Sequence, residues 1–92
     1  METQLISVRQ ELVNLIAEQR GISTESFTVD DKYGSPKLDL DSLDQVEIIM
    51  MIEEKFGIAF DWEVKACAAD KTIQELIAHV ESKLLKKKTE HY

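Results

Sequence analysis

The segment from Leu38 to Gly57 constrains this chain most, because its pattern is that of one amphipathic helix with recognisable ends. Asp41 and Ser42 are both residue types that cap helix N-termini, and Ser42 followed by Gln45 also fits a capping box. Glycine, the residue type at position 57, commonly follows the last turn of a helix. The segment therefore predicts a helix that begins at Asp41 or Ser42 and ends at Gly57.

At 3.6 residues per turn, the apolar side chains of this helix fall on two separate faces. The first face suits a hydrophobic core and contains Ile48, Ile49, Ile52 and Phe56. The second, which we call the docking strip, consists of Leu43, Val46 and Met50, with Glu47, Glu53 and Glu54 around it. A bundle needs only one apolar face from each helix, so the docking strip is a candidate partner surface. Core packing against the following segment is the alternative explanation.

Two further long helices are predicted on either side of this segment. Apolar residues recur at helical spacing from Thr3 to about Gln19, where Gly21 ends the pattern. Near the C-terminus, a capping box of Thr72 and Glu75 opens a helix that runs to about residue 86. The lysines that follow complement the helix dipole and suit a frayed tail over about residues 87–92.

The remaining segments are less regular. A long connection precedes the central helix and either is functional or conceals a short helix. Its only anchors to the core are Ile22, Phe27, Val29, Leu38 and Leu40. After the central helix, Ile58 and Phe60 are expected to pack inward, and residues 62–69 to form a short helix with Val64 and Cys67 facing the core.

Length and composition agree with this pattern. The chain has 92 residues, 43% of them hydrophobic, with one proline and three glycines, which suits a single helical domain over residues 1–92. We therefore predict an all-α fold, a small four-helix bundle of three longer helices and one short one, with a long loop between helices 1 and 2. We expect a monomer.

The charge is strongly asymmetric. Residues 30–63 contain ten acidic residues and three lysines, so this segment accounts for the whole formal charge of −7. Such a chain is a poor match for nucleic acid, whose binding depends on cationic contacts to phosphate. The acidic segment either steers a basic protein partner or is an ordinary solvated face.

Catalytic and metal chemistry find little support. The two histidines, His79 and His91, have no partner at a suggestive spacing, and one cysteine adds too few ligands for a His/Cys metal site. A calcium loop counted from Asp39 would need glycine at its sixth position and a carboxylate at its twelfth, but Asp44 and Met50 stand there. We therefore expect no metal site and no enzyme.

The N-terminus lacks the basic and apolar regions of a signal peptide, and no apolar run is long enough to span a membrane. Cys67 cannot form an intramolecular disulfide and is interpreted as a small packing residue. A cytoplasmic protein is the resulting expectation.

The motif around Ser42 resembles a known family. Residues 41–47 read Asp-Ser-Leu-Asp-Gln-Val-Glu and match the D-S-L-D-x-V-E signature of acyl carrier proteins, and the order of predicted helices also matches. The resemblance implies that Ser42 carries 4′-phosphopantetheine, delivered from coenzyme A by a phosphopantetheinyl transferase, with Asp41 and Leu43 beside it. It also implies that acyl groups are held as thioesters on the thiol of that arm.

The same resemblance assigns a partner surface for acyl-processing enzymes with basic patches. By this resemblance its residues would be Leu43, Val46, Glu47, Met50 and Glu54. Asp44 and Glu53 are further candidates for the same surface. Because the family fold shelters acyl chains between its helices, the face of Ile48, Ile49, Ile52 and Phe56 is also a candidate cavity lining.

Some residues depart from the family pattern. Asp39 stands where the family often has glycine, and the loop over residues 33–37 and the segment over residues 62–71 are somewhat long. The pathway therefore stays open between general fatty acid synthesis and dedicated polyketide, lipid or related synthesis. The alternative function is an unmodified acidic helical adaptor that binds a basic protein surface through the docking strip.

Overall fold

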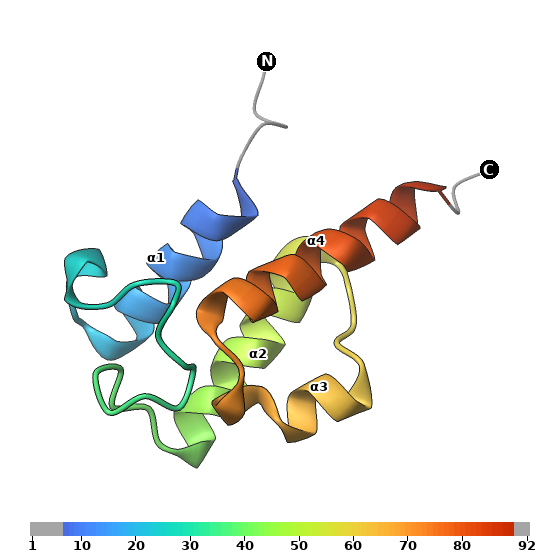
Figure 1. Ribbon diagram of the computed structural model, residues 1–92. Coiled ribbons are helices and arrows are strands. Elements are labelled where there is room, and N and C mark those ends of the chain that lie inside the picture. The colour runs from blue at the N-terminus through green and yellow to red at the C-terminus, as the bar shows by residue number, and fades with distance from the viewer. Residues whose placement is uncertain (1–6, 90–92) are drawn as a thin grey trace.

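The computed structural model describes residues 7–89 of the chain, which form four α-helices and two short 3-10 helices (Figure 1). The α-helices are α1 (Val8–Arg20), α2 (Ser42–Phe56), α3 (Trp62–Ala66) and α4 (Ile73–Thr89), and the 3-10 helices are η2 (Thr24–Ser26) and η3 (Ala68–Asp70). The three long helices pack together and the short α3 lies beside them. This confirms the predicted all-α bundle of three longer helices and one short one.

The core is built from the apolar faces of the long helices. Its buried residues on these helices are Leu12, Ile16, Ala17, Ile48, Ile49, Ile52, Ile73, Leu76, Ile77 and Val80. Phe56 packs against this cluster while staying partly buried. The predicted core face of α2 is therefore confirmed, and the docking strip takes no part in the core.

The helix ends follow local capping chemistry. The Ser7 hydroxyl accepts a hydrogen bond from the Gln10 N–H at 3.2 Å and caps α1, which begins at Val8. The predicted start at Thr3 lies outside the described residues. Gly21 ends α1 in the left-handed conformation, with φ of 69°, as predicted.

At α4, the predicted capping box is confirmed. The Glu75 N–H donates to the Thr72 hydroxyl at 3.0 Å, and the Glu75 carboxylate accepts from the Thr72 N–H at 2.9 Å. The helix continues to Thr89, past the expected end near residue 86, and residues 90–92 of the expected tail lie outside the described part.

The long loop between α1 and α2 conceals a short helix, η2, which was one of the two alternatives for it. Further along, the loop lies against the start of α4. The Ile73 N–H donates to the Asp31 carbonyl at 2.9 Å, and the Gln74 N–H donates to the Val29 carbonyl at 2.8 Å. These bonds give acceptors to N–H groups in the first turn of α4, which have no acceptor within the helix.

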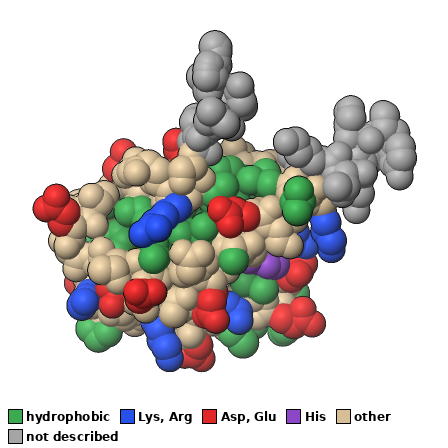
Figure 2. All heavy atoms as spheres, turned by 45° about the horizontal axis from the view of Figure 1, so that its top comes forward, with side chains coloured by type: hydrophobic (Ala, Val, Ile, Leu, Met, Phe, Trp, Pro, Cys, Tyr) green, Lys and Arg blue, Asp and Glu red, His purple; other side chains and the backbone are tan. Residues whose placement is uncertain are grey.

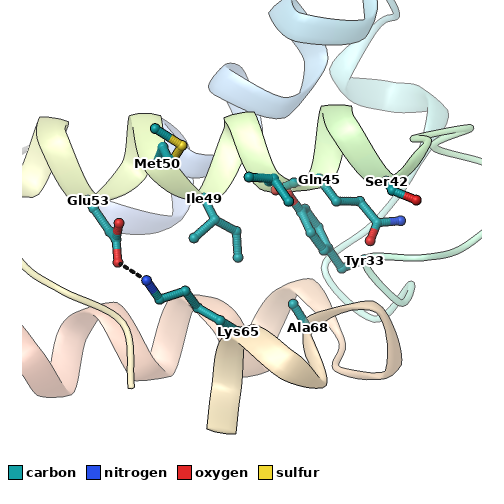
Figure 3. Close-up of a pocket in the computed structure, with 9 residues that line it drawn as sticks. Tyr33, Ser42, Gln45, Ile49, Met50, Glu53, Lys65 and Ala68 are labelled. Atoms are coloured by element: carbon teal, nitrogen blue, oxygen red, sulfur yellow. Dashed lines mark hydrogen bonds and ion pairs between the residues drawn. The ribbon is translucent and has the colours of Figure 1, made fainter. Parts of the chain in front are cut away.

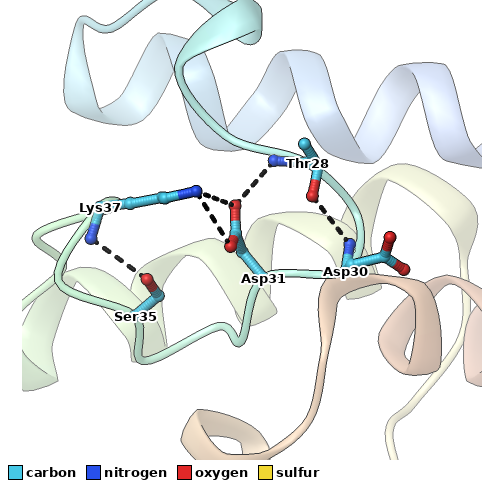
Figure 4. Close-up of polar contacts among 5 residues, drawn as sticks. All are labelled: Thr28, Asp30, Asp31, Ser35 and Lys37. Atoms are coloured by element: carbon cyan, nitrogen blue, oxygen red, sulfur yellow. Dashed lines mark hydrogen bonds and ion pairs between the residues drawn. The ribbon is translucent and has the colours of Figure 1, made fainter.

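A local polar network shapes the same loop (Figure 4). The Asp31 carboxylate accepts from the Thr28 N–H at 2.8 Å and pairs with the Lys37 ammonium at 3.4 Å. The hydroxyls of Thr28 and Ser35 accept from the N–H groups of Asp30 and Lys37, at 3.2 Å each. The hydrogen bond from Thr28, together with the charge of Lys37, lowers the pKa of Asp31.

The segment after α2 differs from its prediction at one residue. Phe60 is buried and Ile58 partly buried as expected, and Val64 packs at the edge of the core. Cys67, predicted to face inward, is exposed, and Ala68 is buried in its place. The reason is that α3 ends at Ala66 and the chain continues as a 3-10 helix, which changes the face that each following residue occupies.

Contacts to α4 hold the N-terminus of α3 in place. The His79 ring lies against the Phe60 ring with centroids 5.2 Å apart, and its Nε2 accepts from the Asp61 N–H at 3.4 Å. The Lys83 ammonium pairs with the Asp61 carboxylate at 2.6 Å and lowers its pKa. The sequence alone predicts no partner for His79. Its partners, Phe60 and Asp61, are far from it in the chain and are brought close only by the fold.

Candidate functional site

Ser42 is the first residue of α2, and the helix is capped by the residue before it. The Asp41 carboxylate accepts from the Asp44 N–H at 2.8 Å, and the Asp44 carboxylate accepts from the Asp41 N–H at 3.4 Å. The predicted capping box of Ser42 and Gln45 is therefore wrong. Because Asp41 does the capping, the exposed Ser42 hydroxyl makes no hydrogen bond within the part of the chain that the structure describes.

The N-terminus of a 15-residue helix also favours negative charge beside Ser42. The first N–H groups of a helix lack helical partners, and the aligned peptide dipoles place positive potential there. A phosphodiester on the Ser42 oxygen would lie next to this positive end. The residues present therefore fit a phosphate-linked group at this position.

Three residues of the loop and of α2 support the position of Ser42. The buried Tyr33 hydroxyl donates to the Gln45 carbonyl at 2.6 Å, and the Gln45 amide donates to the Leu40 carbonyl at 3.2 Å. Burial, with a smaller contribution from the nearby Asp44 charge, raises the pKa of Tyr33. Sequence reasoning missed Tyr33, since a single aromatic residue in a polar loop carries no periodic signal.

The docking strip is exposed along α2. Its side chains have exposed fractions of 64% for Leu43, 55% for Val46 and 58% for Met50. This excludes core packing as their role, because a core side chain would be largely hidden from solvent. Large apolar side chains exposed together on one helix face are typical of a binding surface.

The acidic residues predicted around the strip fall into two groups. Glu47 and Glu54 are exposed, and Glu47 accepts only a peripheral bond from the Gln19 amide at 3.3 Å. Asp44 is half-buried in the capping box of α2. Glu53 is 19% exposed, accepts from the Phe60 N–H at 2.8 Å and pairs with the Lys65 ammonium at 3.4 Å. Asp44 and Glu53 thus also have structural roles, whereas Glu47 and Glu54 are freely presented.

A pocket of about 340 Å³ opens beside Ser42, between α2 and the α3–η3 segment (Figure 3). Its walls are mainly apolar and contain Tyr33, Ser42, Gln45, Val46, Ile49, Met50, Glu53, Lys65 and Ala68. Of the four core residues proposed from sequence as a cavity lining, only Ile49 borders it; Ile48, Ile52 and Phe56 face the bundle interior instead. Tyr33, Lys65 and Ala68 come from other segments and could not be assigned from the pattern of α2.

Asp39, which stands where the related family often has glycine, adopts a left-handed backbone with φ of 51°. This conformation is costly for most L-residues, although aspartate tolerates it better than most. The Asp39 carboxylate pairs with the Arg20 guanidinium at 3.1 Å and so connects the end of α1 to the residues before Ser42. The departure from the family pattern therefore keeps the backbone shape that glycine would allow.

Other parts of the surface carry mixed charge. On the face shown in Figure 2, acidic and basic side chains are interspersed with apolar ones. Within residues 7–89, no group of three or more His, Cys, Asp or Glu side chains is arranged to hold a metal ion. No helix in the described ranges is both long enough and apolar enough to cross a membrane.

Comparison with known proteins agrees with the motif. The family model described as "Phosphopantetheine attachment site" matches residues 10–80, which is most of the chain. The chain is 32% identical over 79 residues to an acyl carrier protein of Campylobacter hominis, covering 84% of this chain and 94% of that protein. It is 34% identical over 80 residues to an acyl carrier protein of Nitratidesulfovibrio vulgaris, covering 85% and 99% respectively.

A shorter match has higher identity. The chain is 45% identical over 47 residues to acyl carrier protein 3 of Ralstonia nicotianae, covering 51% of this chain and 52% of that protein. Together, the longer matches and the family model extend the likeness from the motif to most of the chain.

Proposed function

Because the chain belongs to the acyl carrier protein family, we propose that Ser42 is the attachment point of its 4′-phosphopantetheine arm. The arm supplies a terminal thiol that holds acyl groups as thioesters. One observation supports Ser42 above all: its hydroxyl is exposed at the N-terminus of α2, next to a mainly apolar pocket, and makes no hydrogen bond to any residue that the structure describes. Members of this family carry intermediates for enzymes and are not catalysts themselves.

In the proposed cycle, this chain contributes position and recognition. Asp41 caps α2 and leaves Ser42 accessible to a phosphopantetheinyl transferase, while the N-terminal N–H groups of α2 favour the phosphodiester charge. The pocket between α2 and α3 would shelter an acyl chain when no enzyme is bound, because its apolar walls favour methylene groups over water.

The experiment is mass spectrometry after incubation with coenzyme A and a promiscuous phosphopantetheinyl transferase. The wild-type chain should gain one phosphopantetheine, and Ser42→Ala should gain none. Ser82→Ala, which changes an exposed serine on α4, is the matched control and should be modified like wild type. A wild-type chain that stays unmodified would contradict the proposal and favour the adaptor function, in which Ser42→Ala binds a partner as well as wild type.

We further propose that the docking strip, with Glu47 and Glu54, is the surface that partner enzymes contact. The exposed apolar side chains offer contact area, and the exposed acids complement basic patches and speed encounter. Glu47→Lys and Glu54→Lys should slow modification of Ser42 at low salt, with the deficit shrinking as salt is added. Glu25→Lys, a charge reversal in η2, should leave the rate near that of wild type; equal slowing by Glu25→Lys would show that only net charge matters.

We propose that the partners are acyl-processing enzymes of fatty acid, polyketide or related synthesis. The genes that neighbour this one would distinguish among those pathways. A cytoplasmic location fits this role, and a chain with a single cysteine suits a reducing compartment.

A further inference from the structure

We propose that the ion pair between Glu53 and Lys65 is a length stop for the acyl chain, so that this carrier shelters chains whose apolar end lies before the pair. The inference rests on the proposed attachment at Ser42 and deepens it by naming the residues that select the cargo. Acyl chains that end before the ion pair gain from burial, and longer chains gain nothing more.

The geometry of the pocket gives it two ends (Figure 3). Ser42 lies at one end and the ion pair at the other, with Ile49 between them on α2. Glu53 is eleven residues after Ser42, which at the rise of an α-helix corresponds to roughly 16 Å along the axis. The Lys65 side chain extends from α3 across the pocket toward Glu53, so its stem forms part of the wall and its ammonium marks the end.

The chemistry changes sharply along this length. Val46, Ile49 and Met50 offer apolar surface to each methylene that enters. At the far end, the chain would meet a carboxylate and an ammonium instead. A terminal methyl group placed against these charges would remove water from them without replacing its hydrogen bonds, which is unfavourable. Burial therefore stops being favourable at the ion pair.

Glu53 is held too firmly to move aside easily. Its carboxylate accepts from the Phe60 N–H at 2.8 Å as well as pairing with Lys65, so a displaced Glu53 would leave that N–H without its partner. On the opposite wall, α3 has no buried residue, although its N-terminus is held from α4 through Asp61. The contact between Glu53 and Lys65 adds a direct link between α2 and α3 at this end.

The competing explanation is that Glu53 and Lys65 form an ordinary surface ion pair, which has little effect on stability and none on the length of the acyl chain. The chain contains a matched example on the other side of α2, where the Lys55 ammonium pairs with Glu11 at 3.2 Å. The lysine side chains of the two pairs are equally exposed, at 47% for Lys55 and 46% for Lys65, but Lys55 does not line the pocket. Lys55→Met therefore removes the same charge and a similar pair without touching the proposed stop.

The test loads the thiol of the phosphopantetheine arm on Ser42 with saturated acyl groups from butyryl to palmitoyl and confirms each product by mass spectrometry. It then measures Tm of every acyl form against the holo form of the same variant. In wild type, Tm should rise by up to roughly 3–6 °C for each methylene that is buried and then level off. In the double variant Glu53→Gln/Lys65→Met, which removes both charges and keeps an acceptor for the Phe60 N–H, the rise should continue to longer chains. Lys65→Arg, which keeps the cation, and Lys55→Met should both level off where wild type does.

Two results would overturn the length stop: the Glu53→Gln/Lys65→Met variant levelling off at the wild-type length, or Lys55→Met extending the series as much as that double variant. A Tm that is independent of chain length in wild type would also overturn it, because the chain would then not enter the pocket. Failure of the proposed function looks different, since Ser42 would then accept no phosphopantetheine and no acyl form could be made.

Discussion

Removing the Tyr33 hydroxyl tests how the long loop is fastened to α2 beside Ser42. The Tyr33 side chain is fully buried, and its hydroxyl donates to the Gln45 carbonyl at 2.6 Å, one turn after the start of the helix. Tyr33→Phe keeps the ring and deletes this one bond. The change therefore isolates the hydrogen bond from the packing of the ring.

The expected loss is about 1 kcal/mol. A net hydrogen bond contributes roughly 0.5–1.5 kcal/mol to stability, and a larger loss would require a buried partner to be left unpaired. The Gln45 carbonyl is not left unpaired, because within α2 it also accepts from the N–H four residues later. For a domain of this size, about 1 kcal/mol lowers Tm by roughly 4–8 °C.

Thermal and urea unfolding of the apo protein at neutral pH measure this loss directly. Tyr33→Ala is the comparison variant, because it also removes the ring and should cost about 3–5 kcal/mol, as aromatic truncations in cores do. The pH dependence of unfolding in the alkaline range gives a second measurement, since burial raises the pKa of Tyr33 above its ordinary value. Stability linked to this group is present below the pKa of a tyrosine in the unfolded chain and is lost as the pH rises above it.

Two outcomes would refute the reasoning. If Tyr33→Phe unfolds within about 0.3 kcal/mol of wild type, the hydroxyl contributes no net bond to Gln45. If Tyr33→Phe lowers the free energy of unfolding as much as Tyr33→Ala does, packing of the ring does not explain the larger cost expected for Tyr33→Ala. The loop would then depend on the hydroxyl for its structure.

Three further predictions concern the loop and the α2–α3 connection. Gly34→Ala should lower the free energy of unfolding in urea by about 1–3 kcal/mol. The reason is that a Cβ at residue 34 would lie 2.9 Å from both the Cβ and the carbonyl oxygen of Ala69. An unchanged free energy of unfolding would show that the backbone relaxes to remove this contact. Asp39→Ala should cost about 1 kcal/mol while Asp39→Gly costs less, since only glycine relieves the left-handed backbone; equal Tm values would contradict this. Burial lowers the pKa of His79 in the folded chain. The contribution of His79 to stability is therefore complete above the pKa of an unfolded histidine and is lost as the pH falls. An NMR titration that finds a raised pKa would contradict this direction of the pH dependence.

Much of α2 was predictable because its signals are local. Capping residues, a following glycine and a 3.6-residue period defined its ends and its two faces, and the structure places Ile48 and Ile52 in the core and Val46 on the surface. The one local error was the capping box, which joins Asp41 and Asp44 rather than Ser42 and Gln45. Asp41 and Ser42 are equally good capping residues, and only the hydrogen bond from the Asp44 N–H distinguishes them.

The pocket could not be predicted in the same way, since its walls come from separate segments. Tyr33 precedes α2 by nine residues and Ala68 follows it by twelve, and neither carries a periodic signal that points to α2. The inward face of the segment after α2 was also misassigned at Cys67, because a switch from α to 3-10 geometry has no mark in the sequence. Contacts between segments, rather than propensity, decide these positions.

The acidic segment is less uniform in the folded protein than its formal charge of −7 suggests. Four of its ten acids are in ion pairs, and three of their cationic partners, Arg20, Lys65 and Lys83, come from outside the segment. Within an ion pair, the opposite charges largely cancel at a distance. The electrostatic field that reaches a partner therefore comes mainly from acids without a cation nearby. On α2 the exposed examples are Glu47 and Glu54, which flank the docking strip within four turns of Ser42. The charge that a basic enzyme would sense is therefore concentrated beside the proposed attachment point rather than spread over residues 30–63.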